Sequence, residues 1–273
     1  MGQACERDAH NCVIEGMPLH WASPCIQYTV QRDGSPKAGI DAAALQQEAE
    51  QAFAAWEGVQ CPGGGSPRFH AQYQGPVSCQ RLEAVCGGAS KNDNVLMFHD
   101  QGWPYGVGVI GLTTPTGGES SGLVVDTDLE LNSRDFDFSA NASGPGSVKF
   151  GDVLAHEIGH FLGLAHSDVE GALMSSGYGG LQLSQELLTA DDIAAICAVF
   201  PPGAPLQCPA AAMPAYDQCQ LQPGEVPMCQ MTTMTHQDGG GGGCSVSDAA
   251  PKRGAWSWSA LGVGLLLLRR GKP

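Results

Sequence analysis

The sequence has few basic residues. It contains 13 Lys and Arg against 28 Asp and Glu, which gives a formal net charge of −15 at pH 7. A nucleic-acid-binding protein needs a clustered basic surface, and here Lys and Arg gather only in the last few residues. The composition therefore argues against nucleic acid as a partner and fits an acidic, soluble exported protein.

Paired C-x-x-C spacing is also absent, although the chain has 11 cysteines. So many cysteines are unusual in a cytosolic enzyme of this size, and without paired spacing they favour disulfides in an oxidising compartment. Ten of them could form five bridges, which leaves Cys244 as the odd cysteine. We expect an extracellular or cell-surface protein that acts as a monomer.

Long apolar runs are lacking at both ends. Residues 1–8 contain no apolar stretch that could serve as a signal peptide, so we expect that the start was assigned too late or that the signal was removed. Residues 255–268 are apolar over about 14 positions, fewer than the roughly 20 of an ordinary spanning helix. Tryptophans at the start of this run and a basic cluster at 269–272 nonetheless predict a membrane anchor whose basic end is cytoplasmic.

Periodicity predicts mixed secondary structure in the first hundred residues. Residues 25–30, 68–73 and 94–99 are rich in β-formers and read as strands. Asp41 is the expected N-cap of an amphipathic helix that runs to Trp56. Its apolar face comprises Leu45, Ala49, Ala52, Phe53 and Trp56.

One stretch carries the chemistry of a metal site. It reads H-E-I-G-H-F-L-G-L-A-H from His156 to His166. His156 and His160 are four residues apart, so both imidazoles leave the same face of a helix, with Glu157 between them. Gly163 allows the left-handed turn that ends a helix, after which His166 can return as a third ligand. Three imidazoles and one open position are typical of a catalytic zinc site.

This stretch resembles the zinc signature of the metzincin metallopeptidases. Ser167 directly follows the third histidine, and in this the motif resembles that of the matrixin branch. Residues 172–178, A-L-M-S-S-G-Y, resemble the Met-turn of that family. The resemblance implies that Met174 forms the floor under the zinc and that Tyr178 belongs to the S1′ wall. Matrixins usually have a proline between these two residues, where this chain has Ser176.

The resemblance continues on both sides of the motif. Residues 188–201 look like the C-terminal helix of matrixin catalytic domains, with Thr189 as N-cap, and residues 123–132 look like the edge strand to which a peptide substrate adds. It implies an α+β metzincin catalytic domain with a twisted, mostly parallel sheet of about five strands and three helices. An irregular spacer and a short apolar tail are expected to follow.

The expected domain organisation has four parts. Residues 1–20 form a cysteine-containing extension, 21–202 the matrixin-like catalytic domain, 203–243 a disulfide-pinned spacer rich in Pro, Gln and Gly, and 244–273 the tail. That tail resembles the sorting tails of myxobacterial surface proteins, in which a cysteine, a short apolar segment and terminal arginines direct anchoring. A bacterial origin is the corresponding expectation.

The function implied is zinc-dependent endopeptidase activity on protein substrates, at the cell surface or after secretion. Glu157 is expected to act as general base on a zinc-activated water. Two alternatives remain open at this point. One is a catalytically inactive zinc-containing surface binding protein, and the other is a zinc hydrolase of a non-peptide substrate.

Other polar residues have weaker patterns. Asp126, Asp128 and Glu130 alternate along one strand and share a face, which calcium could use, although a solvated strand face is the interpretation we favour. His70 and His99 are interpreted as strand residues, because the H-G-D loop of a second, structural zinc site is missing. The P-R-C-G-x-P-D pattern of a cysteine switch is missing too.

Overall fold

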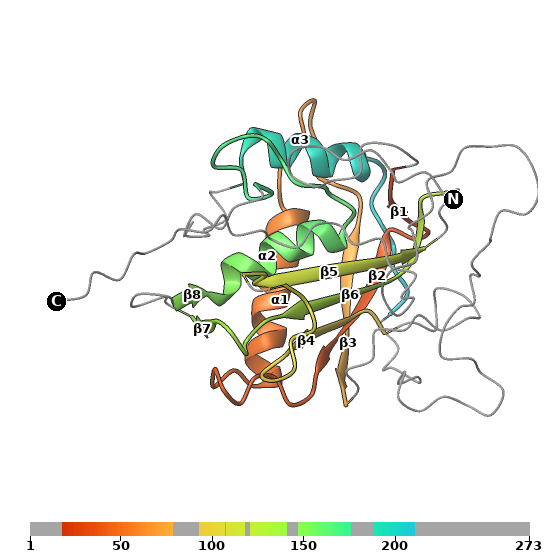
Figure 1. Ribbon diagram of the computed structural model, residues 1–273. Coiled ribbons are helices and arrows are strands. Elements are labelled where there is room, and N and C mark those ends of the chain that lie inside the picture. The colour runs from red at the N-terminus through yellow and green to blue at the C-terminus, as the bar shows by residue number, and fades with distance from the viewer. Residues whose placement is uncertain are drawn as a thin grey trace, which may run out of the picture.

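The computed structural model describes residues 18–78, 93–106, 108–117, 121–140, 147–175 and 188–210 (Figure 1). The predicted anchor at 255–268 and Tyr178 lie outside these ranges. The strands are β1 (His20–Trp21), β2 (Cys25–Gln31), β3 (His70–Val77), β4 (Val95–Phe98), β5 (Gly111–Gly117), β6 (Leu123–Leu131), β7 (Asp137–Ser139) and β8 (Ser147–Lys149). The helices are α1 (Ala42–Glu57), α2 (Phe150–Phe161) and α3 (Ala190–Val199).

Most strands form one sheet in the order β1-β6-β4-β2-β3, and β5 pairs with β6. All pairings along that path are parallel, whereas the β5–β6 pairing is antiparallel. Short β7 and β8 pair separately and lead into α2. The α+β class and the mostly parallel sheet with three helices are therefore confirmed.

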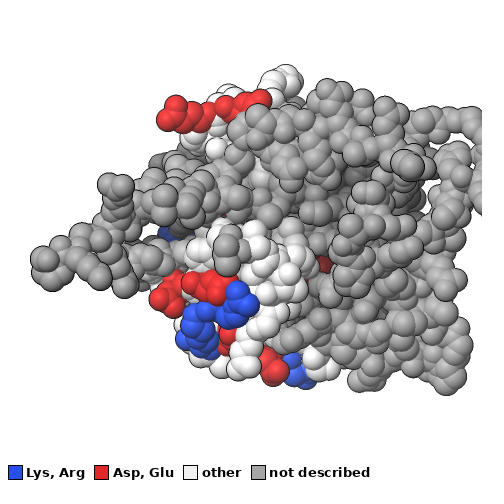
Figure 2. Space-filling model, viewed as in Figure 1, with Lys and Arg blue, Asp and Glu red and all other residues white. Residues whose placement is uncertain are grey.

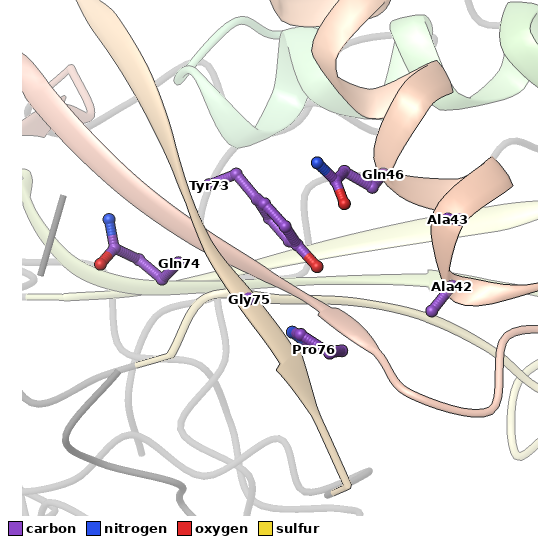
Figure 3. Close-up of a pocket in the computed structure, with 7 residues that line it drawn as sticks. All are labelled: Ala42, Ala43, Gln46, Tyr73, Gln74, Gly75 and Pro76. Atoms are coloured by element: carbon purple, nitrogen blue, oxygen red, sulfur yellow. The ribbon is translucent and has the colours of Figure 1, made fainter. Parts of the chain in front are cut away.

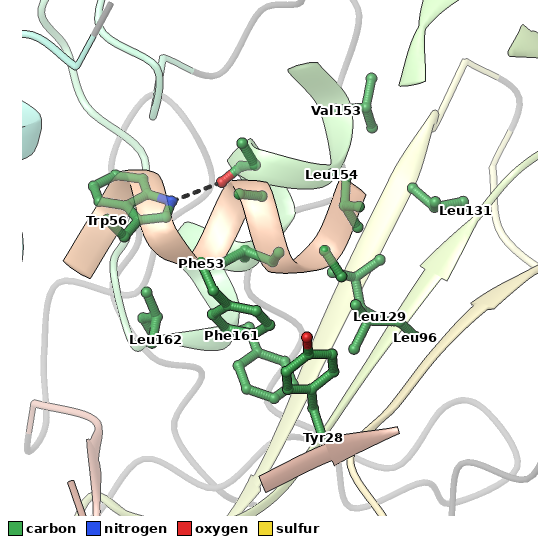
Figure 4. Packing of buried hydrophobic residues seen from close by; sticks show 14 of the residues in the cluster. Tyr28, Phe53, Trp56, Leu96, Leu129, Leu131, Val153, Leu154, Phe161 and Leu162 are labelled. Atoms are coloured by element: carbon green, nitrogen blue, oxygen red, sulfur yellow. Dashed lines mark hydrogen bonds between the residues drawn. The ribbon is translucent and has the colours of Figure 1, made fainter. Parts of the chain in front are cut away.

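Helices α1 and α2 pack together and against one face of the sheet (Figure 1). Helix α1 begins where the Asp41 side chain accepts a hydrogen bond from the Ala44 amide at 2.8 Å, as the sequence predicts. All five apolar residues of its predicted face are buried in the main core. Figure 4 shows Phe53 of α1 beside Phe161 of α2, and Trp56 of α1 hydrogen-bonded to the backbone of α2.

Two predicted strands have different limits in the structure. The predicted strand at 68–73 begins at His70 and extends to Val77. Arg68 is instead engaged with the C-terminal segment, because its amide donates to Phe200 O at 3.1 Å and its guanidinium to Ala204 O at 2.9 Å. The expected strand at 94–99 is present as β4.

The prediction that residues 123–132 form the edge strand is wrong. Strand β6 has β5 on one side and β4 on the other, so it is interior. Among the described strands, β5 pairs with β6 alone and therefore lies at the edge. Its sequence, G-L-T-T-P-T-G, contains Gly and Pro, which have low strand propensity, so the sequence does not predict this strand. Pro115 is tolerated because an edge strand does not need every backbone amide for pairing.

Two disulfides join the C-terminal part of the described chain to its N-terminal half. Cys61 after α1 bonds Cys197 of α3, and Cys25 at the start of β2 bonds Cys208. Gln72 of β3 also donates to Pro209 O at 2.8 Å. Residues 203–210 thus contact the body of the protein, while the division of the chain at residue 202 stays a prediction.

The surface carries mixed charge where it is described. Figure 2 shows acidic and basic residues side by side on the face in view. Some of these residues form ion pairs, among them Lys37–Asp137 at 3.4 Å and Arg134–Asp135 at 2.7 Å. Within the described ranges, no helix is both long enough and apolar enough to cross a membrane.

The Cys61–Cys197 bridge makes a testable contribution to stability. It closes a separation of 136 residues, so its loss frees the unfolded chain and should lower the free energy of unfolding by about 2–5 kcal/mol. Urea unfolding of a Cys61→Ser/Cys197→Ser variant measures this. The exposed substitution Gln60→Ala is the control. A double variant as stable as the parent would contradict a stabilising role of the bridge.

Candidate metal centre and active site

Three histidines converge at the C-terminal half of α2. His156 and His160 lie one helical turn apart, and their ring centroids are 4.8 Å from each other. The ring of His166 lies 5.3 Å from that of His156 and 4.7 Å from that of His160. Their ligand atoms all lie within 4.8 Å of one another, and within the described residues this is the one such group of His, Cys, Asp or Glu.

The return of His166 depends on Gly163. This glycine has φ +103°, a conformation that a side chain would strain, and a Cβ there would lie 3.2 Å from Leu19 O. The turn is closed by hydrogen bonds from Gly163 N to His160 O and from Leu164 N to Gly159 O, both 2.9 Å. The predicted left-handed end of the helix is therefore confirmed.

Backbone carbonyls orient the two helical imidazoles. Nδ1 of His156 lies 2.6 Å from Leu173 O, and Nδ1 of His160 lies 2.8 Å from Leu164 O. A carbonyl only accepts, so each Nδ1 carries the proton and each Nε2 presents a lone pair. Both Nε2 atoms are buried without a hydrogen-bond partner among the described residues.

Burial keeps these imidazoles neutral. It lowers the pKa of His156 to about 3, with a further contribution from neighbouring His166. The pKa of His160 is lowered well below 6.5, first by burial and then by the other two histidines. Neutral imidazoles with unused nitrogens directed to one point fit a zinc ion with an open coordination position.

Glu157 lies between the two helical ligands and is 1% exposed. Burial raises the pKa of its carboxyl to about 8, and a hydrogen bond from the Thr113 hydroxyl opposes that rise. The Thr113 Oγ1 lies 2.7 Å from Oε2 of Glu157. On the other side the carboxylate passes over Gly111, where an added Cβ would lie only 2.7 Å from Oε1.

Thr113 and Gly111 are site residues that sequence reasoning missed. Both belong to β5, which was not expected to be a strand. The sequence offers no signal for their contact with Glu157, because they are more than 40 residues away from it and lie in a stretch that resembles a loop. Only the pairing of β5 beside α2 brings them together.

Met174 packs directly beneath the zinc-motif helix. It is 2% exposed, and a Cβ on Gly159 would overlap its sulfur. Asp192 of α3 holds this segment: its carboxylate accepts hydrogen bonds from Leu173 N at 2.9 Å and Met174 N at 3.0 Å. Met174 thus contacts α2 at Gly159, while its role as the floor under the zinc stays a prediction and Tyr178 lies outside the described residues.

Helix α3 begins as expected. Thr189 is its N-cap and forms a capping box with Asp192, which also accepts from the Thr189 amide at 2.9 Å. The Asp192 side chain is fully buried and so joins the helix start to the Met174 segment. Sequence reasoning placed an acid in this turn but did not foresee that it binds another part of the chain.

The acidic residues of β6 are not solvated, so that prediction is wrong. Asp126, Asp128 and Glu130 are 0%, 1% and 0% exposed. The segment after β4 covers Glu130, because His99 Nε2 lies 2.6 Å from its Oε2 and the Tyr105 hydroxyl donates to Oε1 at 2.5 Å. Burial and then the Asp126 charge raise the pKa of Asp128. Calcium binding here stays a prediction.

The two other histidines of the sequence analysis lie apart from the zinc motif. His70 is the first residue of β3, and His99 directly follows β4.

The pocket drawn in Figure 3 lies elsewhere. It has a volume of about 390 Å³ and is formed by the first turns of α1 and the middle of β3, with the Tyr73 ring as its largest wall. None of its lining residues belongs to the histidine motif. The chemistry therefore belongs to the histidine cluster beside β5.

The neutral histidines predict how acid affects the metal-free protein. In the unfolded chain, imidazoles take up protons near pH 6.5. In the folded protein, His156 and His160 take up protons only at a much lower pH. The free energy of unfolding should therefore fall as pH falls below about 6.5. Glu157 acts in the opposite direction: its folded pKa of about 8 exceeds 4.5, so its contribution falls as pH rises between these values.

Urea unfolding of the full chain in chelator, from pH 4 to 8.5, measures both effects. A His156→Gln/His160→Gln variant should lose much of the decline on the acid side, because it lacks the two groups that take up protons on unfolding. An acid-side decline of the same slope in parent and variant would show that other groups cause it.

Comparison with known proteins agrees with this geometry. A model of the matrixin family matches residues 100–201, a span that contains β5, β6, α2, the three histidines and α3. No curated protein matches the chain. The family match and the convergence of His156, His160 and His166 lead to one conclusion: residues 100–201 are a matrixin domain, and the chain that carries it is a zinc metalloendopeptidase with a three-histidine zinc site.

Proposed function

We propose that this enzyme cleaves protein substrates outside the cell with His156, His160 and His166 as zinc ligands and Glu157 as general base. One observation carries the proposal. The buried Glu157 carboxylate lies between two histidines with unused Nε2 atoms, and its Oε1 has no hydrogen-bond partner among the described residues. A carboxylate so placed is free to exchange a proton with a reacting molecule.

Zinc, when bound, supplies a Lewis acid that polarises the scissile carbonyl and brings the pKa of a water toward about 7. Glu157 accepts the proton of the attacking water and then donates it to the leaving amine. The hydrogen bonds of His156 to Leu173 O and of His160 to Leu164 O hold both rings in the orientation that ligation needs. Met174 supports α2 from below through its contact with Gly159.

The substrate is proposed to bind as an extended peptide along β5. This strand lies at an edge of the described sheet, and its residues Gly111 and Thr113 touch Glu157. An extended chain that pairs with an edge strand gains backbone hydrogen bonds regardless of its side chains. Tyr178 is proposed as part of the S1′ wall because of its place in the family's Met-turn pattern.

The enzyme is proposed to be either secreted or tethered to the cell surface. Matrixins are secreted proteins, and the Cys25–Cys208 and Cys61–Cys197 disulfides are consistent with an extracellular location. The tether would be residues 255–268 with the basic cluster that follows, as in the bacterial sorting tails that residues 244–273 resemble.

The substitution Glu157→Gln tests the general base. It keeps the size of the side chain and removes the basic oxygen, so kcat should fall by about 100-fold or more while zinc remains at one equivalent. Hydrolysis of a quenched protein substrate and elemental analysis of full-length protein measure the two quantities. His160→Ala is the matched control and should lose zinc as well as activity. Full turnover by the glutamine variant would refute the proposed role.

Removal of residues 255–273 tests the tether. The full chain expressed with an export signal should fractionate with the membrane, and the shortened chain should appear in the medium with unchanged activity per zinc. An immunoblot of both fractions, together with the substrate assay, measures this. Release of the full chain into the medium would favour secretion without a tether.

A further inference from the structure

Thr113 occupies a buried position on the face of β5 that looks toward α2. It pairs with Leu129 of β6 in antiparallel register, and residues directly opposite one another in such a pair share a face. Leu129 belongs to the core cluster beneath the helices. Thr113 is 0% exposed, so its side chain cannot touch a substrate.

The Thr113 hydroxyl has two acceptors, and both belong to Glu157. Its Oγ1 lies 2.7 Å from Oε2 of the carboxylate and 3.0 Å from the Glu157 backbone oxygen. Carboxylate and carbonyl oxygens only accept, so the single hydroxyl proton is directed to this one residue. The contact therefore fixes the carboxyl group relative to its own backbone.

The two carboxylate oxygens have unequal surroundings. Oε2 is held by Thr113, whereas Oε1 is buried without a hydrogen-bond partner among the described residues. Oε1 lies over Gly111, which faces the same way as Thr113 and has no Cβ to displace it. Alternate residues of β5 thus leave room for one oxygen and hold the other.

We infer that Thr113 is a positioning residue that assigns the two oxygens of Glu157 to different tasks. Its hydroxyl donates to Oε2 before and after proton transfer, since the carbonyl oxygen of a neutral carboxyl still accepts. Oε1 takes the proton as the O–H bond of the attacking water breaks, and gives it up as the N–H bond of the leaving amine forms. The Thr113 proton itself is never transferred. This inference rests on the proposed role of Glu157 as general base.

A purely structural role of Thr113 makes a different prediction. If the hydroxyl only joined β5 to α2, its loss would lower stability or zinc content, and activity would fall in proportion. If it positions the carboxyl group, its loss lowers kcat at constant zinc and constant KM, because the buried residue does not bind substrate. The two roles are therefore separable by measurement.

The experiment compares Thr113→Val and Thr113→Ser in the full-length protein with Thr29→Val as control. Valine keeps the branched shape without the hydroxyl, and serine keeps the hydroxyl. Thr29 is a buried threonine of β2, outside the proposed site, whose hydroxyl donates to Asp93 O at 3.0 Å. We expect kcat to fall about 10- to 100-fold in Thr113→Val, as for the loss of a hydrogen bond to a charged group, with KM and zinc content unchanged. Thr113→Ser should stay within about threefold of the parent.

Two further readouts do not depend on turnover. The thermal midpoint of each variant reports any loss of stability, and a crystal structure of zinc-free Thr113→Val should show the Glu157 carboxylate turned away from its parent position over Gly111. Parent-like kcat in Thr113→Val, an equal loss in Thr113→Ser, or a loss that follows zinc content would each overturn the inference. Full activity in Glu157→Gln would instead overturn the proposed general base, and the two failures are thus distinguished.

Discussion

The site depends on one constraint, the burial of polar groups along α2. Eleven of the twelve residues of this helix are buried, including two histidines and a glutamate. A buried polar group that forms no hydrogen bond raises the free energy of the folded state, because its contacts with water are not replaced. Each of these three side chains therefore needs a hydrogen-bond partner or a metal ion. The partners come from elsewhere in the chain: Leu173 O for His156, Leu164 O for His160 and the Thr113 hydroxyl for Glu157.

The rest of the fold holds those partners in place. Trp56 of α1 donates to Ala155 O at 3.0 Å, the bond drawn in Figure 4, and Trp21 donates to Phe161 O at 2.9 Å, so α2 is fixed at its middle and its end. Asp192 of α3 fixes the Leu173 segment, and the Cys61–Cys197 bridge attaches α3 to the loop after α1. Metal ligation and proton transfer need such rigid support, since small shifts of a ligand or base reduce both.

Strand β5 connects the sheet to the chemistry. It is an edge strand of the described sheet, and on its helix-facing side Gly111 and Thr113 meet Glu157. A peptide that pairs with this strand would therefore lie beside Glu157, the proposed general base. In the proposed mechanism the same strand would provide the backbone for substrate binding and the hydroxyl that orients Glu157, so binding and catalysis would meet at β5.

The local parts of the site follow from the amino-acid sequence. The spacing of His156, His160 and Gly163 follows from helical geometry, and the N-caps Asp41 and Thr189 follow from side chains that bind nearby amides, so short-range rules suffice for them. The tertiary structure alone decides three other features. These are the contacts of Thr113 and Gly111 with Glu157, the hydrogen bonds of Asp192 to the Leu173–Met174 segment, and the burial of Glu130. They join residues far apart in the chain through sheet pairing and packing, and no local pattern encodes which distant segments will meet.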